Sequence, residues 1–274
     1  MSLKGKAKEV LKIIEEGGFY NIEEKWIDIH DQIDYSVKNS KTYTPEQFNE
    51  LTTPMVEGNG KLNIIVTEET TQIAASRLYK EGYEDLVLLN FASAKNAGGG
   101  FINGAKAQEE DLARCSTLYK CLLSQSEYYE ANRNQDSMLY TDHVIYSPKI
   151  PWFRTRSRDL PNEIYFSSVI TAPAPNANQA IRHGERPEAV SRALKRRCGQ
   201  VLGVARDNGH ANIILGAWGC GVFGNDPVNV AKSFSYWLKS PAFSSSFKNV
   251  LFAVYDKSKT KSTYKAFKDE FEIA

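Results

Sequence analysis

Apolar positions recur at helical spacing in the first part of the chain. Between residues 4 and 16 they follow one another at three- and four-residue intervals, which predicts a helix that ends at Gly17-Gly18. A short strand is expected around residues 26–29. Thr44-Pro45 has the pattern of a helix N-cap followed by a first-turn proline, so a short helix is expected to begin there.

From residue 62 onward, short apolar runs alternate with longer helical patterns. The expected strands are 62–66, 86–91, 144–146, 164–171, 212–215 and 250–255, and the expected helices are 70–80, 108–123, 187–206, 227–238 and 263–271. Such alternation predicts an α/β fold with a mixed or mostly parallel sheet and helices on both faces. A 60-residue segment buries little apolar surface alone, so we predict an N-terminal extension over 1–60 packed on a domain over 61–274.

Length and composition are those of an ordinary globular protein. The 274 residues, 42% hydrophobic and 24% charged, exclude wholesale disorder and fit one large domain. A net charge of +1 argues against a protein whose main task is coating duplex DNA. The apolar runs are too short to span a bilayer, and the N-terminus lacks the apolar segment of a secretory signal. We therefore expect a cytoplasmic or nuclear protein without a membrane partner.

Cysteine, histidine and the basic clusters carry little chemical signal. The four cysteines include no Cys-x-x-Cys pair and have no histidine at zinc-ligand spacing, which disfavours a metal site and a disulfide framework. Arg154/Arg156/Arg158 and Lys195-Arg196-Arg197 are interpreted as solvated faces. Attraction of a polyanion is the alternative interpretation of these clusters.

Two of the predicted strands end in glycine-rich loops, at the strand edge where open α/β sheets bind ligands. Gly98-Gly99-Gly100 follows strand 86–91. Alone it would indicate a flexible surface loop, but three ordered glycines also permit a sharp turn or a close approach to a ligand. The second loop runs from strand 212–215 into Asp226-Pro227, an N-cap followed by a first helical residue. Free N–H groups and the helix dipole make that loop suitable for a diphosphate.

The second loop also matches the dinucleotide-binding pattern G-x-G-x-x-G, with Gly219, Gly221 and Gly224. The pattern lies near the C-terminus, however, and beyond the helix start the next acidic residue is Asp256, well past the usual ribose-binding spacing of about 20 residues. We therefore predict phosphate binding and disfavour a nicotinamide-dependent oxidoreductase.

A pair of carboxylates, Glu109 and Glu110, opens the helix expected after the triple glycine. Adjacent helical residues point about 100° apart, so both cannot face the core, but both can face a loop packed over the helix N-terminus. Acidic residues are common in a first turn because they favour the helix dipole. The position beside a glycine loop is what favours acid–base chemistry next to a bound nucleotide.

These residues resemble the signature of a known enzyme family, the poly(ADP-ribose) glycohydrolases (PARGs). The resemblance rests on two motifs. The first is Gly98-Gly99-Gly100, followed after seven further residues by Gln108-Glu109-Glu110. The second, similar to the diphosphate loop of that family, is Gly219-Cys220-Gly221-Val222-Phe223-Gly224-Asn225. Residues 62–257 resemble the microbial-type branch, with which Phe91-Ala92-Ser93-Ala94-Lys95-Asn96 and Tyr146-Ser147-Pro148 also agree. The resemblance implies a three-layer α/β/α macrodomain with a mixed central sheet that hydrolyses ribose–ribose bonds of poly(ADP-ribose) and releases ADP-ribose, without a metal or cofactor.

The resemblance also assigns roles to residues. Glu110 matches the catalytic carboxylate, Glu109 the neighbour that positions the ribose hydroxyls, and Gln108 is expected to orient the pair. The implied substrate contacts are Asn96, Gly98, Gly99 and Gly100 in the first loop and Gly219, Cys220, Gly221, Val222, Phe223, Gly224 and Asn225 in the second.

The adenine end of the substrate has weaker candidates. Tyr255, at the end of the last expected strand, is a candidate for stacking, although an aromatic residue at a strand end is more often part of the core. Residues 67–70, through Glu68 or Glu69, are the other candidate.

The expected partners are poly(ADP-ribose), ADP-ribose and ADP-ribosylated proteins. The rival interpretation is a macrodomain that binds ADP-ribose without cleaving it. The carboxylate pair discriminates between the two, because binding alone does not require it.

Overall fold

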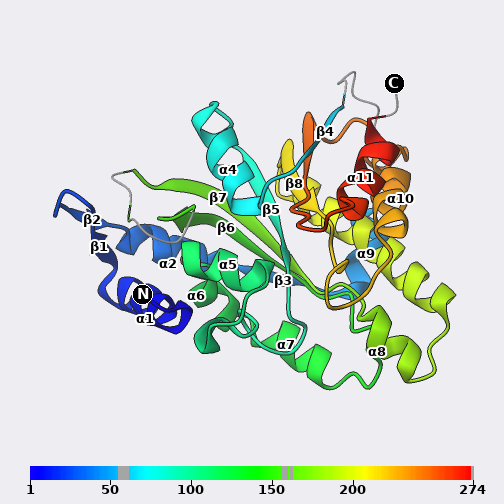
Figure 1. The fold of residues 1–274 in the computed structure, drawn as a ribbon, viewed down its shortest axis with the longest axis horizontal. Coiled ribbons are helices and arrows are strands. Elements are labelled where there is room, and N and C mark those ends of the chain that lie inside the picture. Colours follow the sequence, from blue (N-terminus) through cyan, green and yellow to red (C-terminus); the bar gives the residue numbers. More distant parts are fainter. Residues whose placement is uncertain (55–61, 156–159, 161–162, 273–274) are drawn as a thin grey trace.

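The centre of the molecule is one mixed β-sheet. The computed structural model describes residues 1–54, 62–155, 160 and 163–272. Within them the sheet contains β3 (Lys41–Tyr43), β4 (Asn63–Thr67), β5 (Leu86–Phe91), β6 (Val144–Trp152), β7 (Tyr165–Ala172), β8 (Asn212–Gly216) and β9 (Asn249–Ala253). Their order is β3-β6-β7-β5-β8-β9-β4 (Figure 1). The strands from β7 to β4 are parallel, whereas β6 is antiparallel to both β7 and β3. The prediction of a mixed sheet is confirmed.

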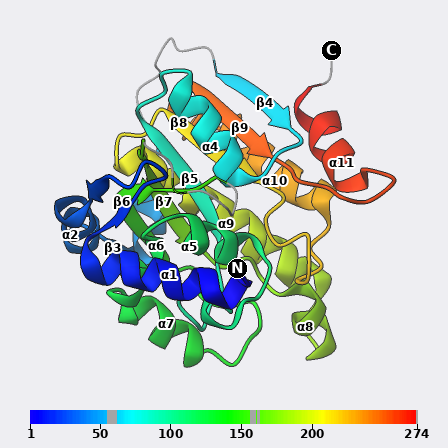
Figure 2. The same cartoon turned by 60° about the vertical axis from the view of Figure 1, so that its left-hand side comes forward.

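Helices cover both faces of this sheet, as Figures 1 and 2 show. One face carries α4 (Thr71–Lys80), α5 (Gln108–Cys115), α6 (Leu118–Leu123) and α7 (Ser126–Arg133), and the other carries α3 (Phe48–Leu51), α9 (Pro187–Asp207), α10 (Pro227–Leu238) and α11 (Ser262–Phe271). Leu86 and Leu88 of β5 pack with the first group, and Val87 and Leu89 with the second. Successive strand residues point to opposite faces, so this strand, apolar from Leu86 to Leu89, requires cover on both sides.

The N-terminal segment packs beside α5 (Figure 2). It contains α1 (Leu3–Glu16), β1 (Gly18–Tyr20), β2 (Trp26–Asp28) and α2 (His30–Lys38); β1 and β2 form a separate two-stranded sheet. Apolar residues of α1 share a buried cluster with Phe101 and Phe153. Strand β3, which also precedes residue 60, belongs to the main sheet. The predicted boundary between residues 60 and 61 lies outside the described residues, and the division into two parts stays a prediction.

Local sequence signals predicted where a helix begins but did not predict where a helix is interrupted. The Asp226 carboxylate accepts the Val228 N–H over 3.2 Å, which confirms the predicted N-cap of α10. The helix expected over 108–123 is instead broken into α5 and α6. Ser116 is extended there, its hydroxyl donates to Leu112 O over 2.8 Å, and its backbone pairs with Trp152. A serine hydroxyl offers the chain an alternative to helical hydrogen bonds, and the bridge to β6 favours the break.

Other differences from the predicted elements concern length. Strand β6 extends beyond the predicted 144–146 through a register shift near Ser147, and β9 ends at Ala253 instead of Tyr255. The short elements α2, β3, α7 and α8 (Ala177–Arg182) were not predicted. Thr44-Pro45 does begin a short helical segment, with the 3₁₀ turn η1 (Pro45–Gln47) followed by α3.

Two arginines that were expected on solvated faces are buried, so that interpretation was wrong for them. Arg154 is 3% exposed and pairs with Glu9 of α1 over 2.6 Å. Arg197 is fully buried and donates to Asp142 over 2.9 Å and to the carbonyl oxygens of Pro173 and Leu139. Position 197 lies on the inward face of α9, a placement that three consecutive basic residues in the sequence do not reveal. Lys195 and Arg196 are exposed as expected, whereas Arg156 and Arg158 lie outside the described residues.

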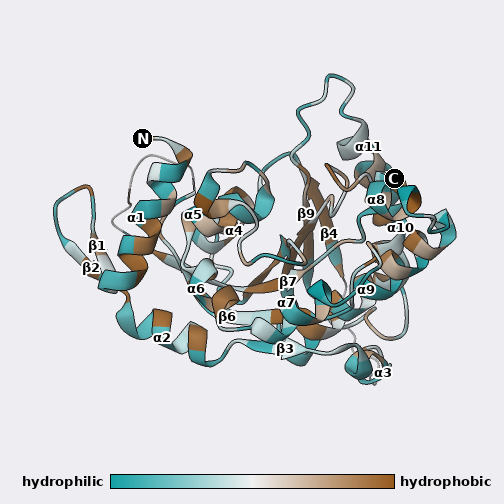
Figure 3. Ribbon diagram, turned by 90° about the horizontal axis from the view of Figure 1, so that it is seen from below, coloured by the Kyte–Doolittle hydropathy of each residue, from teal (hydrophilic) through white to brown (hydrophobic). Residues whose placement is uncertain are grey.

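Apolar residues are concentrated on the central strands, and the outward helix faces are mostly hydrophilic (Figure 3). Among the residues that the structure describes, no helix has the length and apolar character needed to cross a bilayer.

The neighbouring residues Arg196 and Arg197 provide a test of the buried network, because both pair with Asp142. Removing Arg197 leaves the buried Asp142 carboxylate and three backbone carbonyl groups without this donor. We therefore expect Arg197→Met to lower the free energy of unfolding by about 3–5 kcal/mol. Arg196 is half exposed, so Arg196→Met should cost less than about 1 kcal/mol. Urea denaturation measures both, and equal losses would contradict this account.

Candidate active site

The candidate site lies at the carboxyl ends of the parallel strands. Phe91 ends β5 opposite Ala172 of β7, and Gly216 ends β8 opposite Ala253 of β9. The loops that leave these strands therefore meet at one edge of the sheet. Two cavities open there, with volumes of about 810 and 1010 Å³, and Phe91 and Ala107 line both. They are called below the adenine-side cavity, after the sequence prediction that places the adenine near Tyr255, and the carboxylate cavity.

Both carboxylates of the acidic pair are buried under the loop that follows β5. Glu109 is 2% exposed and Glu110 7%. Glu110 accepts the N–H groups of Gly100 and Ala107 over 2.8 and 2.9 Å. Glu109 accepts the Ser93 N–H over 2.7 Å and the Asn90 side-chain amide over 3.2 Å. The pair therefore holds the loop at several points, and a helix-dipole preference alone does not account for its burial.

The triple glycine lies directly against these carboxylates. Gly99 has a φ of +58°, and a Cβ atom at this position would lie 2.5 Å from Glu110 Oε1 and 3.0 Å from Glu109 Oε2. A side chain here would be both strained and in collision with the pair. Glycine at position 99 thus allows the backbone to pass over both carboxylates.

Burial changes the acidity of the pair. It raises the pKa of Glu109 to about 8, and the nearby charge of Glu110 adds to the rise, while hydrogen bonds from Ser93 and Asn90 oppose it. A carboxyl with this pKa retains its proton at neutral pH. The site therefore holds an acid that can donate a proton or a hydrogen bond near pH 7.

Gln108 acts on the sheet rather than on the carboxylates. Its side chain accepts the Phe91 N–H over 2.8 Å and donates to Leu89 O over 2.8 Å and to the Thr71 hydroxyl over 3.1 Å. These bonds attach the start of α5 to the end of β5. Gln108 forms no hydrogen bond with Glu109 or Glu110, so any effect on the orientation of the pair is exerted through the position of the helix.

The second loop presents backbone donors. Among the described residues, the N–H groups of Gly221, Val222 and Phe223 have no hydrogen-bond acceptor. The loop is shaped by two asparagines: Asn225 donates to Pro175 O over 2.8 Å, and Asn178 donates to Val222 O over 3.1 Å. Consecutive free N–H groups ahead of a helix N-terminus form a concavity suited to an anion such as a diphosphate.

The three glycines of this loop differ in whether the turn requires a glycine at their position. Gly219 and Gly224 have φ values of +73° and +70°, and a Cβ atom at Gly224 would collide with Asn178. Gly221 has no positive φ, and a Cβ atom there would meet nothing within 4 Å. The turn therefore needs glycine at 219 and 224, whereas the fold does not explain glycine at 221.

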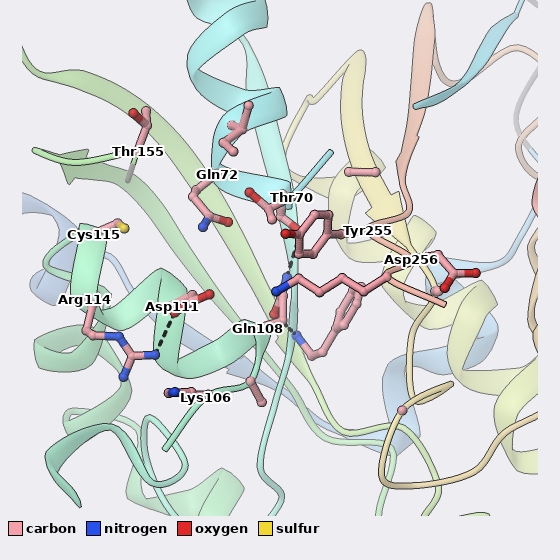
Figure 4. Close-up of a pocket in the computed structure, with 18 of the residues that line it drawn as sticks. Thr70, Gln72, Lys106, Gln108, Asp111, Arg114, Cys115, Thr155, Tyr255 and Asp256 are labelled. Atoms are coloured by element: carbon pink, nitrogen blue, oxygen red, sulfur yellow. Dashed lines mark hydrogen bonds and ion pairs between the residues drawn. The ribbon is translucent and has the colours of Figure 1, made fainter. Parts of the chain in front are cut away.

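The adenine-side cavity lies between α4, α5 and the segment that follows β9 (Figure 4). Tyr255 is 54% exposed and lines it, so the alternative that Tyr255 is a core residue is wrong. Glu68 and Glu69 do not line this cavity; they pair with Lys261 and Arg77. Thr70 of the same segment lines it instead, as does Gln72 in the first turn of α4, and the buried Thr70 hydroxyl has no hydrogen-bond partner among the described residues.

The two cavities bring together most of the predicted site residues. Asn96, Gly99, Gly100, Glu109, Glu110 and Phe223 line the carboxylate cavity, and Gln108, Cys220, Gly221 and Tyr255 line the adenine-side cavity. Gly98, Gly219, Val222, Gly224 and Asn225 line neither. Gly98 lies against the Tyr119 ring, and Val222 projects outward with 89% exposure. In the described part of the chain, no three His, Cys, Asp or Glu side chains gather in a way that could hold a metal ion.

Sequence reasoning missed three residues around the carboxylates. Asn90 is fully buried and donates to Glu109; the one polar letter within the apolar run 86–91 was a usable signal for it. Tyr129 lines the carboxylate cavity with a buried hydroxyl that has no partner among the described residues. Tyr140 lines it too, with its ring centroid 6.2 Å from that of Phe223. Nothing in the sequence pattern distinguished these tyrosines.

Fold and site together define a macrodomain-like α/β/α protein with two glycine loops around a buried carboxylate pair. The chain belongs to the family described as "Microbial-type PARG, catalytic domain", whose family model matches residues 7–155, just over half of the chain.

Solved structures agree with this family. The chain is similar to the poly(ADP-ribose) glycohydrolase of Thermomonospora curvata, with 39% identity, a TM-score of 0.93, and coverage of 98% of this chain and 99% of that one. A second structure of that enzyme, bound to the inhibitor ADP-HPD, is 40% identical, with a TM-score of 0.91 and the same coverage. The Deinococcus radiodurans enzyme in complex with ADP-ribose is 43% identical, with a TM-score of 0.81 and coverage of 88% of this chain and 97% of that one. No curated protein matched the sequence.

The raised pKa of Glu109 predicts how stability varies with pH. Its pKa in the folded protein, about 8, lies above its ordinary value of 4.5, so the folded state keeps a proton that the unfolded state releases. The stabilisation from this proton is complete below pH 4.5 and is lost as the pH rises toward 8. We expect the urea midpoint of the wild type to fall over this range more steeply than that of Glu109→Gln, which cannot titrate.

The matched control is Glu127→Gln, which changes an exposed first-turn glutamate of α7. Its midpoints should follow those of the wild type across the pH range. Parallel curves for wild type and Glu109→Gln would contradict the raised pKa.

Proposed function

We propose that this protein hydrolyses the ribose–ribose glycosidic bonds of poly(ADP-ribose) and releases ADP-ribose. The observation that carries the proposal is the buried pair Glu109–Glu110, which faces a cavity directly under the triple glycine. Membership of the microbial-type PARG family supports it. So do similar structures that hold ADP-ribose or the inhibitor ADP-HPD.

The two cavities fit the parts of one ADP-ribose unit. The adenine would lie in the adenine-side cavity against Tyr255, and the diphosphate would accept the free N–H groups of residues 221–223. The distal ribose would then lie in the carboxylate cavity beside Gly99 and Phe223. In this placement its anomeric carbon reaches the carboxylate pair, and Asn96 lies near the ribose hydroxyls.

Glu110 is the proposed acid–base catalyst. Its carboxyl donates a proton to the departing 2′-oxygen as the bond from that oxygen to the anomeric carbon breaks, and the ribose takes on oxocarbenium character. The resulting carboxylate then takes a proton from a water molecule whose oxygen bonds to the anomeric carbon. Glu109 hydrogen-bonds the ribose hydroxyls, a role that its retained proton at neutral pH suits. Every step of this scheme uses side chains of this chain and water.

A macrodomain that only binds ADP-ribose is the alternative. Binding requires the diphosphate loop and the adenine-side cavity but no acid beside the anomeric carbon. Two buried carboxylates, held by backbone donors of residues 93–107 and by the side chain of Asn90 in β5, are costly unless they have a use. The carboxylate pair therefore favours hydrolysis.

Two further expectations belong to this proposal. Polymer attached to proteins presents the same terminal unit, so ADP-ribosylated proteins are inferred to be substrates. Residues 1–60 are inferred to act as an extension that supports the catalytic domain over 61–274, because α1 packs on Phe101, next to the triple glycine.

The catalytic assignment is tested by Glu110→Gln, which keeps the size of the side chain but removes the proton donor. We expect turnover of poly(ADP-ribose) to fall by roughly a hundred- to ten-thousand-fold. ADP-ribose binding, measured by calorimetry, should persist. Glu127→Gln again serves as the control and should retain full activity. Near-normal turnover by Glu110→Gln would remove the assignment.

The diphosphate assignment is tested by Gly221→Val. A side chain at position 221 meets no protein atom within 4 Å but would project where the phosphate oxygens are proposed to lie. We expect an unchanged melting temperature together with ADP-ribose binding weakened at least tenfold. Gly224→Val is the matched control, since its positive φ and its collision with Asn178 predict lost stability. Normal affinity in a well-folded Gly221→Val protein would refute the diphosphate site.

A further inference from the structure

The carboxylate cavity is larger than the proposed reaction centre requires. Its volume of about 1010 Å³ reaches the upper end of the range typical of whole drug-sized ligands. A single distal ribose does not fill such a space. The remaining wall comes from α6, α7 and the loop after α7, through Leu123, Tyr129, Arg133 and Tyr140.

The geometry of the scissile bond assigns this remaining space. The proposed ADP-ribose unit extends from the carboxylates toward Gly221 and the adenine-side cavity. The leaving oxygen is bonded to the anomeric carbon of this unit but belongs to the neighbouring unit. It must therefore point away from the ADP-ribose unit that stays bound. What is attached to it therefore lies in the outer half of the carboxylate cavity, toward α7.

The outer wall carries uncompensated positive charge. Lys95 and Arg133 both line the cavity, and neither forms an ion pair with a carboxylate of the described residues. Arg133 donates to Lys95 O over 2.9 Å, so its guanidinium lies against the backbone of the Lys95 segment. An exposed guanidinium with further N–H donors, together with an ammonium group that lines the same cavity, is suited to a diphosphate.

The cavity also presents apolar and aromatic surface. Ile102 and Leu123 are 42% and 54% exposed, unusual values for large apolar residues, and both line the cavity. Tyr140 adds an aromatic ring that is partly exposed. Stacking on an aromatic ring is how proteins hold bases without reading their sequence.

Tyr140 has a backbone conformation that is unfavourable for tyrosine, and hydrogen bonds hold it there. Its φ is +60°, a left-handed conformation that residues other than glycine and asparagine rarely adopt. Buried Arg197 donates to Leu139 O over 2.9 Å and to Tyr140 O over 3.4 Å, and Asn132 accepts the Thr141 N–H over 2.9 Å. A strained conformation fixed from both sides and facing a cavity indicates that the position of the ring has a use.

We propose that the outer half of the carboxylate cavity binds the nucleotide unit on the leaving side of the scissile bond, with its adenine on Tyr140 and its diphosphate beside Lys95 and Arg133. This inference rests on the proposed function and extends it: the protein recognises two consecutive ADP-ribose units, one on each side of the bond that is cut. Tyr140 is a substrate-contacting residue that affects polymer and dimer substrates but not binding of the free product.

The test compares Tyr140→Gly with the wild-type full chain. Glycine removes the ring and suits a φ of +60°, so the fold should be retained with an equal or higher melting temperature. We expect kcat/KM for the dimer of ADP-ribose to fall by roughly five- to a hundredfold, the usual effect of losing one stacked base. The calorimetric Kd for ADP-ribose should stay within about twofold, since that ligand fills only the other side.

A second pair of variants tests the charges. Arg133→Gln should lower kcat/KM for the dimer and reduce the dependence of its KM on salt concentration, because one phosphate contact is lost. Lys38→Gln, which removes an exposed cation outside the cavity, should change neither quantity.

Tyr140→Phe is the control for Tyr140→Gly. It keeps the ring and should therefore cleave the dimer at the wild-type rate.

The outcomes separate this inference from the function on which it rests. If the wild type does not cleave poly(ADP-ribose), the proposed function itself fails. If the wild type cleaves it, but Tyr140→Gly and Arg133→Gln cleave the dimer at the wild-type rate, the leaving-side site is refuted and the glycohydrolase assignment stands. Equal losses of dimer turnover and ADP-ribose affinity would also refute it, because they would indicate a general distortion of the site.

Discussion

The structure of the site depends on hydrogen bonds between two buried carboxylates and the backbone that crosses over them. Glu109 and Glu110 accept N–H groups from Ser93, Gly100 and Ala107, so the whole loop after β5 is held around them. Burial under this loop raises the pKa of Glu109 to about 8, although the hydrogen bonds themselves oppose the rise. Loop conformation and acid strength thus have the same physical origin.

A second buried network supports the opposite wall of the cavity. Arg197, on the inward face of α9, binds Asp142 and the carbonyl groups that precede it, and so holds the segment that carries Tyr140. An unpaired guanidinium in the core would be strongly unfavourable, so this segment cannot readily move away from its donors. The two networks fix the distance between the reaction centre and the wall proposed to bind the leaving unit.

The second glycine loop shows how one sequence motif can serve two purposes. Gly219 and Gly224 are required by the turn itself, since both have positive φ. Gly221 is not, since a Cβ atom there would meet nothing within 4 Å, and the N–H groups of residues 221–223 have no acceptor within the described part of the chain. The G-x-G-x-x-G spacing therefore arises here from turn geometry at two of its glycines, and the third is the one proposed to allow access for a phosphate. It does not indicate a nicotinamide-binding fold, and its position after β8, near the end of the chain, is consistent with that difference.

Local physics explains which parts of this protein its sequence determines. Apolar periodicity predicted the alternating strands and helices, Asp226-Pro227 predicted the start of α10, and the motif spacing led to the carboxylate pair and the family. These features depend on a few neighbouring residues: their spacing, a cap or a turn. The break between α5 and α6, the burial of Arg154 and Arg197, and the placement of Tyr129 and Tyr140 were decided only by tertiary structure. Each of them depends on which distant segment lies opposite, such as Trp152 for Ser116 or Asp142 for Arg197, and a residue's neighbours along the chain do not carry that information.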